Sequence, residues 1–252
     1  MTMRIIARLD VKNNFVIKGI NLEGLRKIGD VKNITEKYYK EKIDELLIMD
    51  SVASLYGRNN LFDFIKGITK EIFVPITLGG GIRTLPDIEK ALNSGADKVS
   101  INSQALLEPK FLREATQNFG ESTIVVSVEA KKIAPETWEP YKFCGRERTN
   151  INLNEWLNTI QDFGCGEILL TSIDKEGTET GFDLSLLNSI YNKITKPLII
   201  SGGCGKLEDI KYIHENYKDT SVALASVLHY DILNIKKIKD LINYINYLCF
   251  DK

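Results

Sequence analysis

The feature that most constrains the fold is the regular return of short apolar runs along the chain. Between these runs lie stretches of helical periodicity, for example 59–72 and 153–163. Strands that alternate with helices build a parallel sheet with the helices outside it. The predicted strands are rich in β-branched residues and leucine, and they are eight in number: 5–10, 45–50, 75–79, 98–102, 124–129, 167–172, 197–202 and 221–226.

The number of strand–helix units distinguishes two kinds of α/β fold. Eight units in 252 residues is the usual size of a closed (β/α)₈ TIM barrel. An open, doubly wound sheet usually contains fewer strands in a chain of this length. The sequence therefore favours a single barrel domain over residues 1–252, with the open sheet as the alternative.

The two halves of the sequence repeat each other. The stretch IIARLDVK at 5–12 returns as IVVSVEAK at 124–131, and PITLGGGIRTLPDI at 75–88 returns as PLIISGGCGKLEDI at 197–210. A nearly constant spacing predicts two half-barrels, about 1–120 and 121–252, that form one barrel. The first and fifth strands then face each other across the barrel axis.

The repeat places two carboxylates in equivalent positions, because Asp10 and Glu129 each end a predicted strand. In TIM barrels the active site lies at the C-terminal ends of the strands. Both side chains should therefore reach the same opening from opposite walls, as a proton donor and a proton acceptor require. A strand-end carboxylate can also simply cap the following loop, and the sequence does not say which of the two would be the acid.

Glycines are doubled in the same way, at 79–82 (GGGI) and 202–205 (GGCG). Where a strand gives way to a helix, glycines allow the backbone N–H groups to point toward a phosphate. A single glycine run is often only a turn, but two equivalent runs predict two phosphate sites and a substrate with a phosphate at each end. The expected contacts are small residues at or after strand ends, together with a loop after strand 6: Asn102, Ser103, Ser226, Gly177 and Thr178.

Charged residues stand at the opposite ends of four strands. Arg4, Glu45, Lys98 and Glu167 precede or begin strands 1, 2, 4 and 6. They would form a ring across the barrel floor, or they would be four separate surface charges. The pattern alone leaves both readings open.

Composition excludes several classes of protein. The net charge is −1, from 33 basic and 34 acidic residues that are well mixed, so neither a nucleic acid nor a membrane surface is an expected partner. The first ten residues include Arg4, Arg8 and Asp10, and no apolar run is long enough to span a bilayer, so we expect a cytoplasmic protein. Four scattered cysteines and two isolated histidines favour neither a metal site nor a hydrolase triad, and no cofactor is expected.

Several motifs between about residue 4 and residue 230 are distinctive: IIARLDVK, LEGLRKIGD, GGGIRT, GADKVSIN, GEILLTSIDKEGT, SGGCGK and LASVLHY. Together they resemble those of one known family, the cyclase (synthase) subunit of imidazole glycerol phosphate synthase. The resemblance implies a lyase-type cyclase of histidine biosynthesis that takes ammonia from a glutaminase partner. It would convert a bis-phosphorylated ribulosyl aminoimidazole carboxamide into imidazole glycerol phosphate and the aminoimidazole carboxamide ribonucleotide.

The resemblance also implies roles for individual residues. The catalytic pair of the family falls on Asp10 and Glu129, and a substrate-holding lysine falls on Lys18. The four floor charges match the gate through which the family admits ammonia, so the glutaminase would dock on the N-terminal face of the barrel as a heterodimer. The phosphate-binding residues of the family fall on Gly81, Asn102, Ser103, Gly177, Gly203 and Ser226.

Three residues depart from the family pattern. Glu129 and Glu176 replace aspartates, and Arg8 replaces a small cysteine. By the period of two along a strand, Arg8 should point into the barrel below Asp10, where a guanidinium would lower the pKa of that carboxyl or reach an anionic substrate. These departures favour an alternative, a paralogue that channels ammonia to a sugar of a surface-polysaccharide or nonulosonic-acid pathway. A non-catalytic activator of the glutaminase and a related isomerase are further alternatives.

Overall fold

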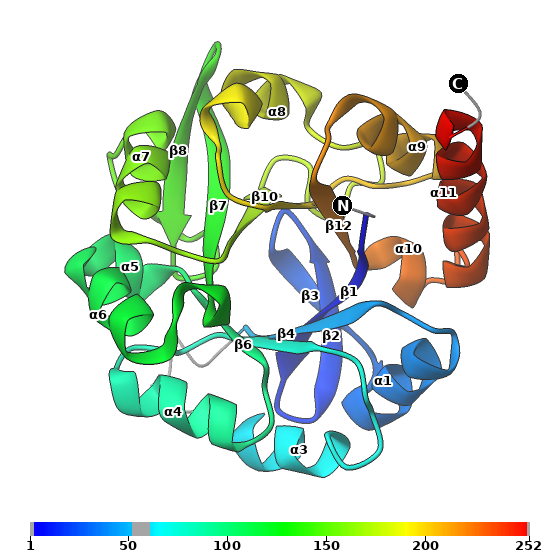
Figure 1. Ribbon diagram of the computed structural model, residues 1–252, viewed down its shortest axis with the longest axis horizontal. Coiled ribbons are helices and arrows are strands. Elements are labelled where there is room, and N and C mark those ends of the chain that lie inside the picture. Colours follow the sequence, from blue (N-terminus) through cyan, green and yellow to red (C-terminus); the bar gives the residue numbers. More distant parts are fainter. Residues whose placement is uncertain (1–2, 52–60, 251–252) are drawn as a thin grey trace.

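Eight parallel strands close into a barrel in the computed structural model, which describes residues 3–51 and 61–250 (Figure 1). Each strand pairs with the next along the chain, and the circle closes because β12 pairs with β1. The predicted barrel is therefore confirmed, and the open sheet is wrong. The barrel strands are β1 (Ile5–Lys12), β4 (Glu45–Asp50), β5 (Ile76–Gly79), β6 (Lys98–Ile101), β7 (Ile124–Ala134), β10 (Glu167–Ser172), β11 (Leu198–Ser201) and β12 (Thr220–Leu224).

Helices surround the strands in the described part of the chain, and α11 lies at the outer edge (Figure 1). The predicted helix at 153–163 is confirmed, and the predicted segment 59–72 contains α3, although its first two residues lie outside the described ranges. The helices are α1 (Val31–Lys40), α3 (Leu61–Ile68), α4 (Leu85–Asn93), α5 (Ser103–Leu107), α6 (Lys110–Phe119), α7 (Leu153–Phe163), α8 (Leu184–Ile190), α9 (Leu207–Asn216), α10 (Ser226–His229) and α11 (Ile235–Phe250), with 3₁₀ turns η1 (Glu121–Thr123) and η2 (Tyr191–Lys193).

Four further strands lie outside the barrel and were not predicted. Strict alternation of strand and helix misses the antiparallel β2 (Phe15–Ile20), β3 (Glu23–Asp30), β8 (Thr137–Lys142) and β9 (Glu147–Arg148). β2 pairs with β1 and β8 pairs with β7, so each half of the barrel carries a hairpin extension on its first strand. The turns between these strands do not contain Asn-Gly, the strongest hairpin signal, which is why the pattern was missed.

The alternation of side chains along the strands produces two apolar cores. The larger core lies between the strands and the surrounding helices. A smaller cluster fills the barrel interior, and it consists of Ile6, Leu47, Val125, Leu169, Ile199 and Ala223. Because the interior is packed, the C-terminal opening is separated from the charged floor by an apolar layer.

The described residues contain no helix of the length and hydropathy that a membrane span requires. Nor do they contain a cluster of three or more potential metal ligands. The three cysteines whose side chains are described, Cys144, Cys165 and Cys204, form no disulfide.

Candidate functional site

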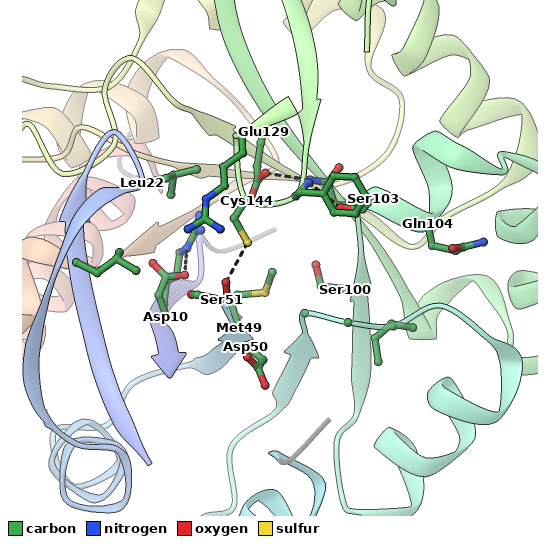
Figure 2. A pocket seen from close by; sticks show the side chains of 18 of the residues that line it. Asp10, Leu22, Met49, Asp50, Ser51, Ser100, Ser103, Gln104, Glu129 and Cys144 are labelled. Atoms are coloured by element: carbon green, nitrogen blue, oxygen red, sulfur yellow. Dashed lines mark hydrogen bonds and ion pairs between the residues drawn. The ribbon is translucent and has the colours of Figure 1, made fainter. Parts of the chain in front are cut away.

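The two predicted carboxylates lie in one cavity at the C-terminal end of the barrel. Asp10 on β1 and Glu129 on β7 both line this space of about 280 Å³ (Figure 2). Their strands are the first and fifth of the closed barrel, so the side chains approach from different walls. Each is largely buried, with 7% of Asp10 and 5% of Glu129 exposed. The cavity can therefore hold a substrate between two carboxyl groups.

Asp10 faces positive charge. The Nε atom of Arg8 donates a hydrogen bond to Oδ1 of Asp10 at 3.1 Å, and both side chains are buried. Burial by itself would raise the pKa of Asp10, but the charges of Arg8 and Lys18 and the hydrogen bond from Arg8 lower it below its ordinary value. Asp10 is therefore a carboxylate throughout the neutral range.

Glu129 is held by neutral donors instead. Its Oε2 atom accepts a hydrogen bond from Nδ2 of Asn102 at 3.1 Å and from the N–H of Gly145 at 2.8 Å. Burial raises the pKa of Glu129 to about 7, against the opposing effects of Arg8 and of these two hydrogen bonds. Glu129 can therefore gain or lose a proton near neutral pH, which suits a general acid or base.

Arg8 points into the cavity, as its position on the strand predicts. Its Nη1 atom donates to Oγ1 of Thr171 at 2.8 Å and to Oγ of Ser201 at 3.2 Å. Only 3% of the residue is exposed. The guanidinium therefore spans the barrel interior from β1 to β10 and β11.

The predicted phosphate contacts of the first half line the same large cavity: Gly81, Asn102 and Ser103. Gly81 has a φ of 72°, and it follows Gly80 at 91°, so the turn after β5 uses a backbone conformation that favours glycine. Oγ of Ser103 accepts a hydrogen bond from the N–H of Phe143 at 2.9 Å. These residues share the cavity with Glu129, and the side chain of Asn102 contacts that carboxyl directly.

The predicted contacts of the second half line a much smaller cavity of about 20 Å³: Gly177, Gly203 and Ser226. Lys18 lines both cavities and so lies between the two sites. Thr178 does not line either cavity. Its hydroxyl and its N–H both donate to the carbonyl of Lys175, at 2.8 and 3.1 Å, which stabilises the loop after β10.

The second cavity is narrow because the β2–β3 hairpin packs over it. Lys18 on β2 and Glu176 in the loop after β10 form an ion pair, with 3% of each side chain exposed. The N–H of Asn21 also donates to the carbonyl of Glu176 at 2.7 Å. Burial lowers the pKa of Lys18 to about 8, despite the opposing attraction of Asp10.

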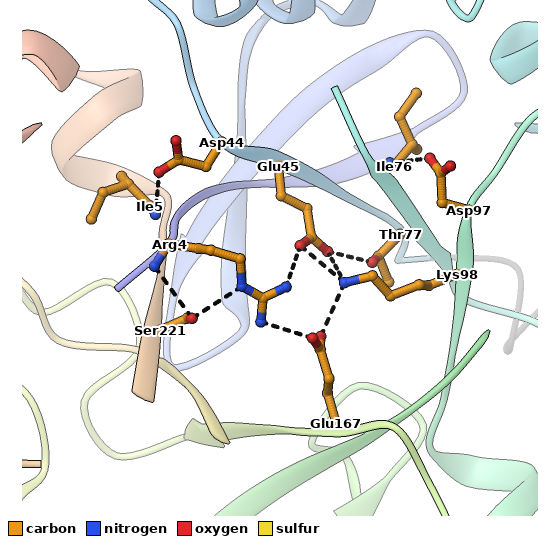
Figure 3. Close-up of polar contacts among 10 residues, drawn as sticks. All are labelled: Arg4, Ile5, Asp44, Glu45, Ile76, Thr77, Asp97, Lys98, Glu167 and Ser221. Atoms are coloured by element: carbon orange, nitrogen blue, oxygen red, sulfur yellow. Dashed lines mark hydrogen bonds and ion pairs between the residues drawn. The ribbon is translucent and has the colours of Figure 1, made fainter. Parts of the chain in front are cut away.

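The four charges at the barrel floor form a closed ring (Figure 3). Arg4 contacts Glu45 and Glu167 at 2.8 Å each, and Lys98 contacts the same two carboxylates at 3.0 and 3.1 Å. The ring reading of the sequence pattern is thus the one that the structure shows. Two hydroxyls that the pattern missed extend the ring, because Thr77 donates to Glu45 at 2.7 Å and Ser221 accepts from Nε of Arg4 at 3.2 Å.

Sequence reasoning also missed the loop between β8 and β9, which reaches the cavity and includes Phe143, Cys144 and Arg146. Phe143, Cys144 and Gly145 have φ values of 53°, 57° and 73°, and the N–H groups of Phe143 and Gly145 donate to Ser103 and Glu129. The run TWEPYK at 137–142, with aromatic residues and flanking Pro and Gly, was the signal for this hairpin.

Comparisons with known proteins agree with the geometry. The model of the family described as "Histidine biosynthesis protein" matches residues 4–234. A Legionella pneumophila protein named imidazole glycerol phosphate synthase subunit HisF is 47% identical over 207 residues, which cover 82% of this chain and 98% of that protein. Proteins of the same name from Lactococcus lactis (strain IL1403) and Hydrogenobaculum are 40% and 41% identical; each alignment covers 95% of this chain, and 93% and 95% of the relative.

Proposed function

The chain belongs to the histidine biosynthesis protein family, and we propose that it is the cyclase subunit of an imidazole glycerol phosphate synthase. It would use ammonia from a glutaminase partner to convert a bis-phosphorylated ribulosyl aminoimidazole carboxamide. The products would be imidazole glycerol phosphate and the aminoimidazole carboxamide ribonucleotide. This reaction makes it a lyase-type enzyme that works as part of a glutamine amidotransferase.

The placement of Asp10 and Glu129 in one buried cavity carries this proposal. Addition of ammonia and closure of the imidazole ring require a proton to leave one nitrogen while another group on the substrate is protonated. Two carboxyl groups with different proton affinities, on opposite strands, supply a base and an acid for these steps. Burial excludes water from the reacting atoms, so the electrostatic interactions of each carboxyl with a bound substrate are stronger than they would be in water.

The glycine turns support a substrate with two phosphates. Backbone N–H groups at Gly81 and Gly203 would bind one phosphate each, and Asn102, Ser103, Gly177 and Ser226 lie beside them in the two cavities. Lys18 lies between the two sites and would contact the middle of the substrate. Thr178 would act on the loop that carries Gly177, since its hydroxyl is bonded within that loop.

The floor ring supports delivery of ammonia from a partner on the N-terminal face of the barrel. Glu45 is almost fully buried, whereas about a third of the Arg4 side chain, 32%, is exposed toward that face. Ammonia that enters there would pass between the four paired charges, then through the apolar interior, to reach the cavity. The glutaminase would therefore dock over Arg4, Glu45, Lys98 and Glu167.

The alternative of a sugar-amidating paralogue gains no support from the relatives. The Legionella, Lactococcus and Hydrogenobaculum proteins are all named as subunits of imidazole glycerol phosphate synthase. The proposal therefore does not extend to a surface-polysaccharide or nonulosonic-acid sugar as the acceptor.

The test supplies the purified chain with the phosphorylated ribulosyl substrate and ammonium salts, and follows loss of the substrate by absorbance. Turnover is expected, and Asp10→Asn and Glu129→Gln should each lower kcat by roughly 10²- to 10⁴-fold, the usual contribution of a general acid or base. Lys211→Gln, at an exposed helical pair on α9, is the matched control and should leave kcat unchanged.

Absence of turnover by the chain, with none gained by an Arg8→Cys/Glu129→Asp double variant that restores the family residues, would contradict the proposed substrate. Full activity of Asp10→Asn would instead favour a non-catalytic activator of the glutaminase.

A further inference from the structure

The two carboxylates at the barrel mouth have different neighbours, and Arg8 is the cause. Its guanidinium lies in the barrel interior, above the apolar cluster and below the open cavity. Nε donates to Asp10, and Nη1 donates to the hydroxyls of Thr171 on β10 and Ser201 on β11. A planar guanidinium fixed at two of its nitrogens keeps one orientation, and this orientation presents it to Asp10.

Glu129 receives no such contact. Among the described residues, no cation lies within ion-pair distance of Glu129, whose hydrogen bonds come from an amide side chain and a backbone N–H. Arg8 forms its ion pair with Asp10. The twofold repeat therefore supplies two equivalent carboxyl positions, and one arginine makes them unequal.

We propose that Arg8 is a positioning residue that holds Asp10 as a carboxylate, and so makes Asp10 the proton acceptor and Glu129 the proton donor. The assignment of roles rests on the proposed function, whereas the difference in charge does not. At rest, protonation of Asp10 would leave a buried guanidinium without its counter-charge, so Asp10 starts the reaction ionised and holds an accepted proton only until that proton passes to Glu129. Protonation of Glu129 breaks no ion pair.

The other charged groups around the cavity do not replace Arg8. Lys18 on β2 and His229 on α10 both act on Asp10, but burial lowers the pKa of Lys18 to about 8 and that of His229 to about 4. His229 is therefore neutral at neutral pH, and Lys18 forms an ion pair with Glu176. Arg83 and Arg146 also line the cavity, but Arg8 is the arginine that forms the ion pair with Asp10, and it stays charged at every working pH.

Two more titratable groups lie near the pair. Cys144 of the β8–β9 loop and Asp50 of β4 line the cavity. Cys144 contributes to the raised pKa of Arg8. The negative charge of Asp10 raises the pKa of Glu129 further, since two nearby carboxyl groups do not ionise together easily. An ionised Asp10 thus favours a protonated Glu129, in agreement with the proposed roles.

Condensation of ammonia with the ribulosyl carbonyl releases one water, and the proton count then closes over the step that forms the ring and releases the leaving nitrogen. Asp10 accepts one proton from the nitrogen that ammonia contributes, and Glu129 gives one proton to the nitrogen that leaves. The pair returns to its starting state when one proton passes from Asp10 to Glu129, directly or through solvent.

The test is a ¹³C NMR titration of the full-length chain labelled at the aspartate and glutamate carboxyl carbons, with resonances assigned from Asp10→Asn and Glu129→Gln. We expect Asp10 to titrate below its ordinary value of 3.8 and Glu129 near 7. In Arg8→Cys the midpoint of Asp10 should rise by more than about one pH unit, the usual effect of a charge at this distance. Arg113→Gln, on the exposed side of α6, is the matched arginine control and should move neither midpoint.

A second pair of variants keeps the inference testable if Arg8→Cys does not fold. Arg8→Lys retains a cation, and should keep the midpoint of Asp10 low. Thr171→Val/Ser201→Ala retains Arg8 but removes both hydroxyls that hold Nη1, and should raise the midpoint of Asp10 by less than Arg8→Cys does. Wild-type Asp10 titrating above Glu129, or a midpoint of Asp10 that none of the Arg8 and hydroxyl variants moves, would overturn the inference.

Kinetics then test the roles. The acid limb of the kcat–pH profile should move to higher pH in Arg8→Cys, whereas a purely structural role would lower kcat equally at all pH values. The titration requires no substrate, so a chain that is inactive with the phosphorylated ribulosyl substrate would contradict the proposed function and leave the titration result intact.

Discussion

The two halves of the barrel have similar glycine turns at equivalent positions, but the cavities beside these turns differ in volume. In the first half, the added Cβ of an alanine at Gly80 would lie 2.2 Å from the carbonyl oxygen of Asp50, and in the second half that at Gly202 would lie 2.9 Å from the carbonyl oxygen of Ser172. These are equivalent positions of the repeat. Nevertheless, the first-half cavity measures about 280 Å³ and the second-half cavity about 20 Å³.

The hairpins explain the difference. The β2–β3 hairpin of the first half leans over the second half, where a Cβ on Gly177 would lie 2.3 Å from the carbonyl oxygen of Gly19. The β8–β9 loop of the second half instead places the N–H of Gly145 against Glu129. Equivalent strands therefore carry extensions with different roles, and a repeat in sequence does not guarantee two equal binding sites.

The largest effect is expected from breaking the ion pair that closes the second half. Glu176→Gln leaves Lys18 buried without its ion-pair partner, with only the more distant attraction of Asp10 and Glu179, and should lower the free energy of unfolding by roughly 3 to 5 kcal/mol. Urea unfolding at neutral pH measures this loss, and Lys211→Gln is the control at an exposed pair, with an expected change below about 1 kcal/mol.

A Lys18→Met/Glu176→Leu double variant should recover part of the stability lost in Glu176→Gln, because it removes both buried charges together. A loss below about 1 kcal/mol in Glu176→Gln would show that the pair does not hold the second half closed.

The next largest effect is a difference between Glu129 and Asp10 in how their contributions to stability depend on pH. Glu129 has a raised pKa in the folded state, so its contribution to stability is full below pH 4.5 and declines as pH rises through about 7. The decline amounts to roughly 3 kcal/mol, at 1.36 kcal/mol per pKa unit. Glu129→Gln should therefore gain stability relative to wild type between pH 5 and pH 8, as urea unfolding at the two pH values would show.

Asp10→Asn should show the opposite behaviour, since the pKa of Asp10 is lowered and its contribution is lost only as pH falls into the acid range. Its difference from wild type should change less between pH 5.5 and pH 8 than that of Glu129→Gln does, and only because the charge of Asp10 acts on the pKa values of Glu129 and Lys18. Parallel stability curves for wild type and Glu129→Gln would contradict the predicted difference between the two carboxylates.

The smallest effect compares the same turn in both halves. Gly80→Ala and Gly202→Ala each place a side chain at positive φ, 91° and 95°, and against a carbonyl oxygen. Each should cost on the order of 1 to 3 kcal/mol of unfolding free energy, with the larger cost at Gly80, where the approach is tighter. Thermal or urea unfolding measures both, and a lower cost at Gly80 than at Gly202 would contradict the comparison.

Features that depend on local sequence were predictable. Thr84 and Asp87 form the capping box of α4, as their spacing predicts, with Pro86 in the first turn and Gly95 directly after the C-cap residue Ser94. The inward direction of Arg8 followed from the period of two along β1. The Lys18–Glu176 pair was not predictable, since its residues lie 158 positions apart and come from a hairpin that has no strong turn signal.

The sequence by itself predicted the barrel, its repeat and the two carboxyl positions, because strand and helix periods are properties of neighbouring residues and the repeat can be read directly along the chain. The tertiary structure decided which of the two cavities is large enough to be open and which carboxylate stays ionised. Both depend on contacts between distant segments, where burial and one nearby guanidinium set the energies of charges that the sequence shows as alike.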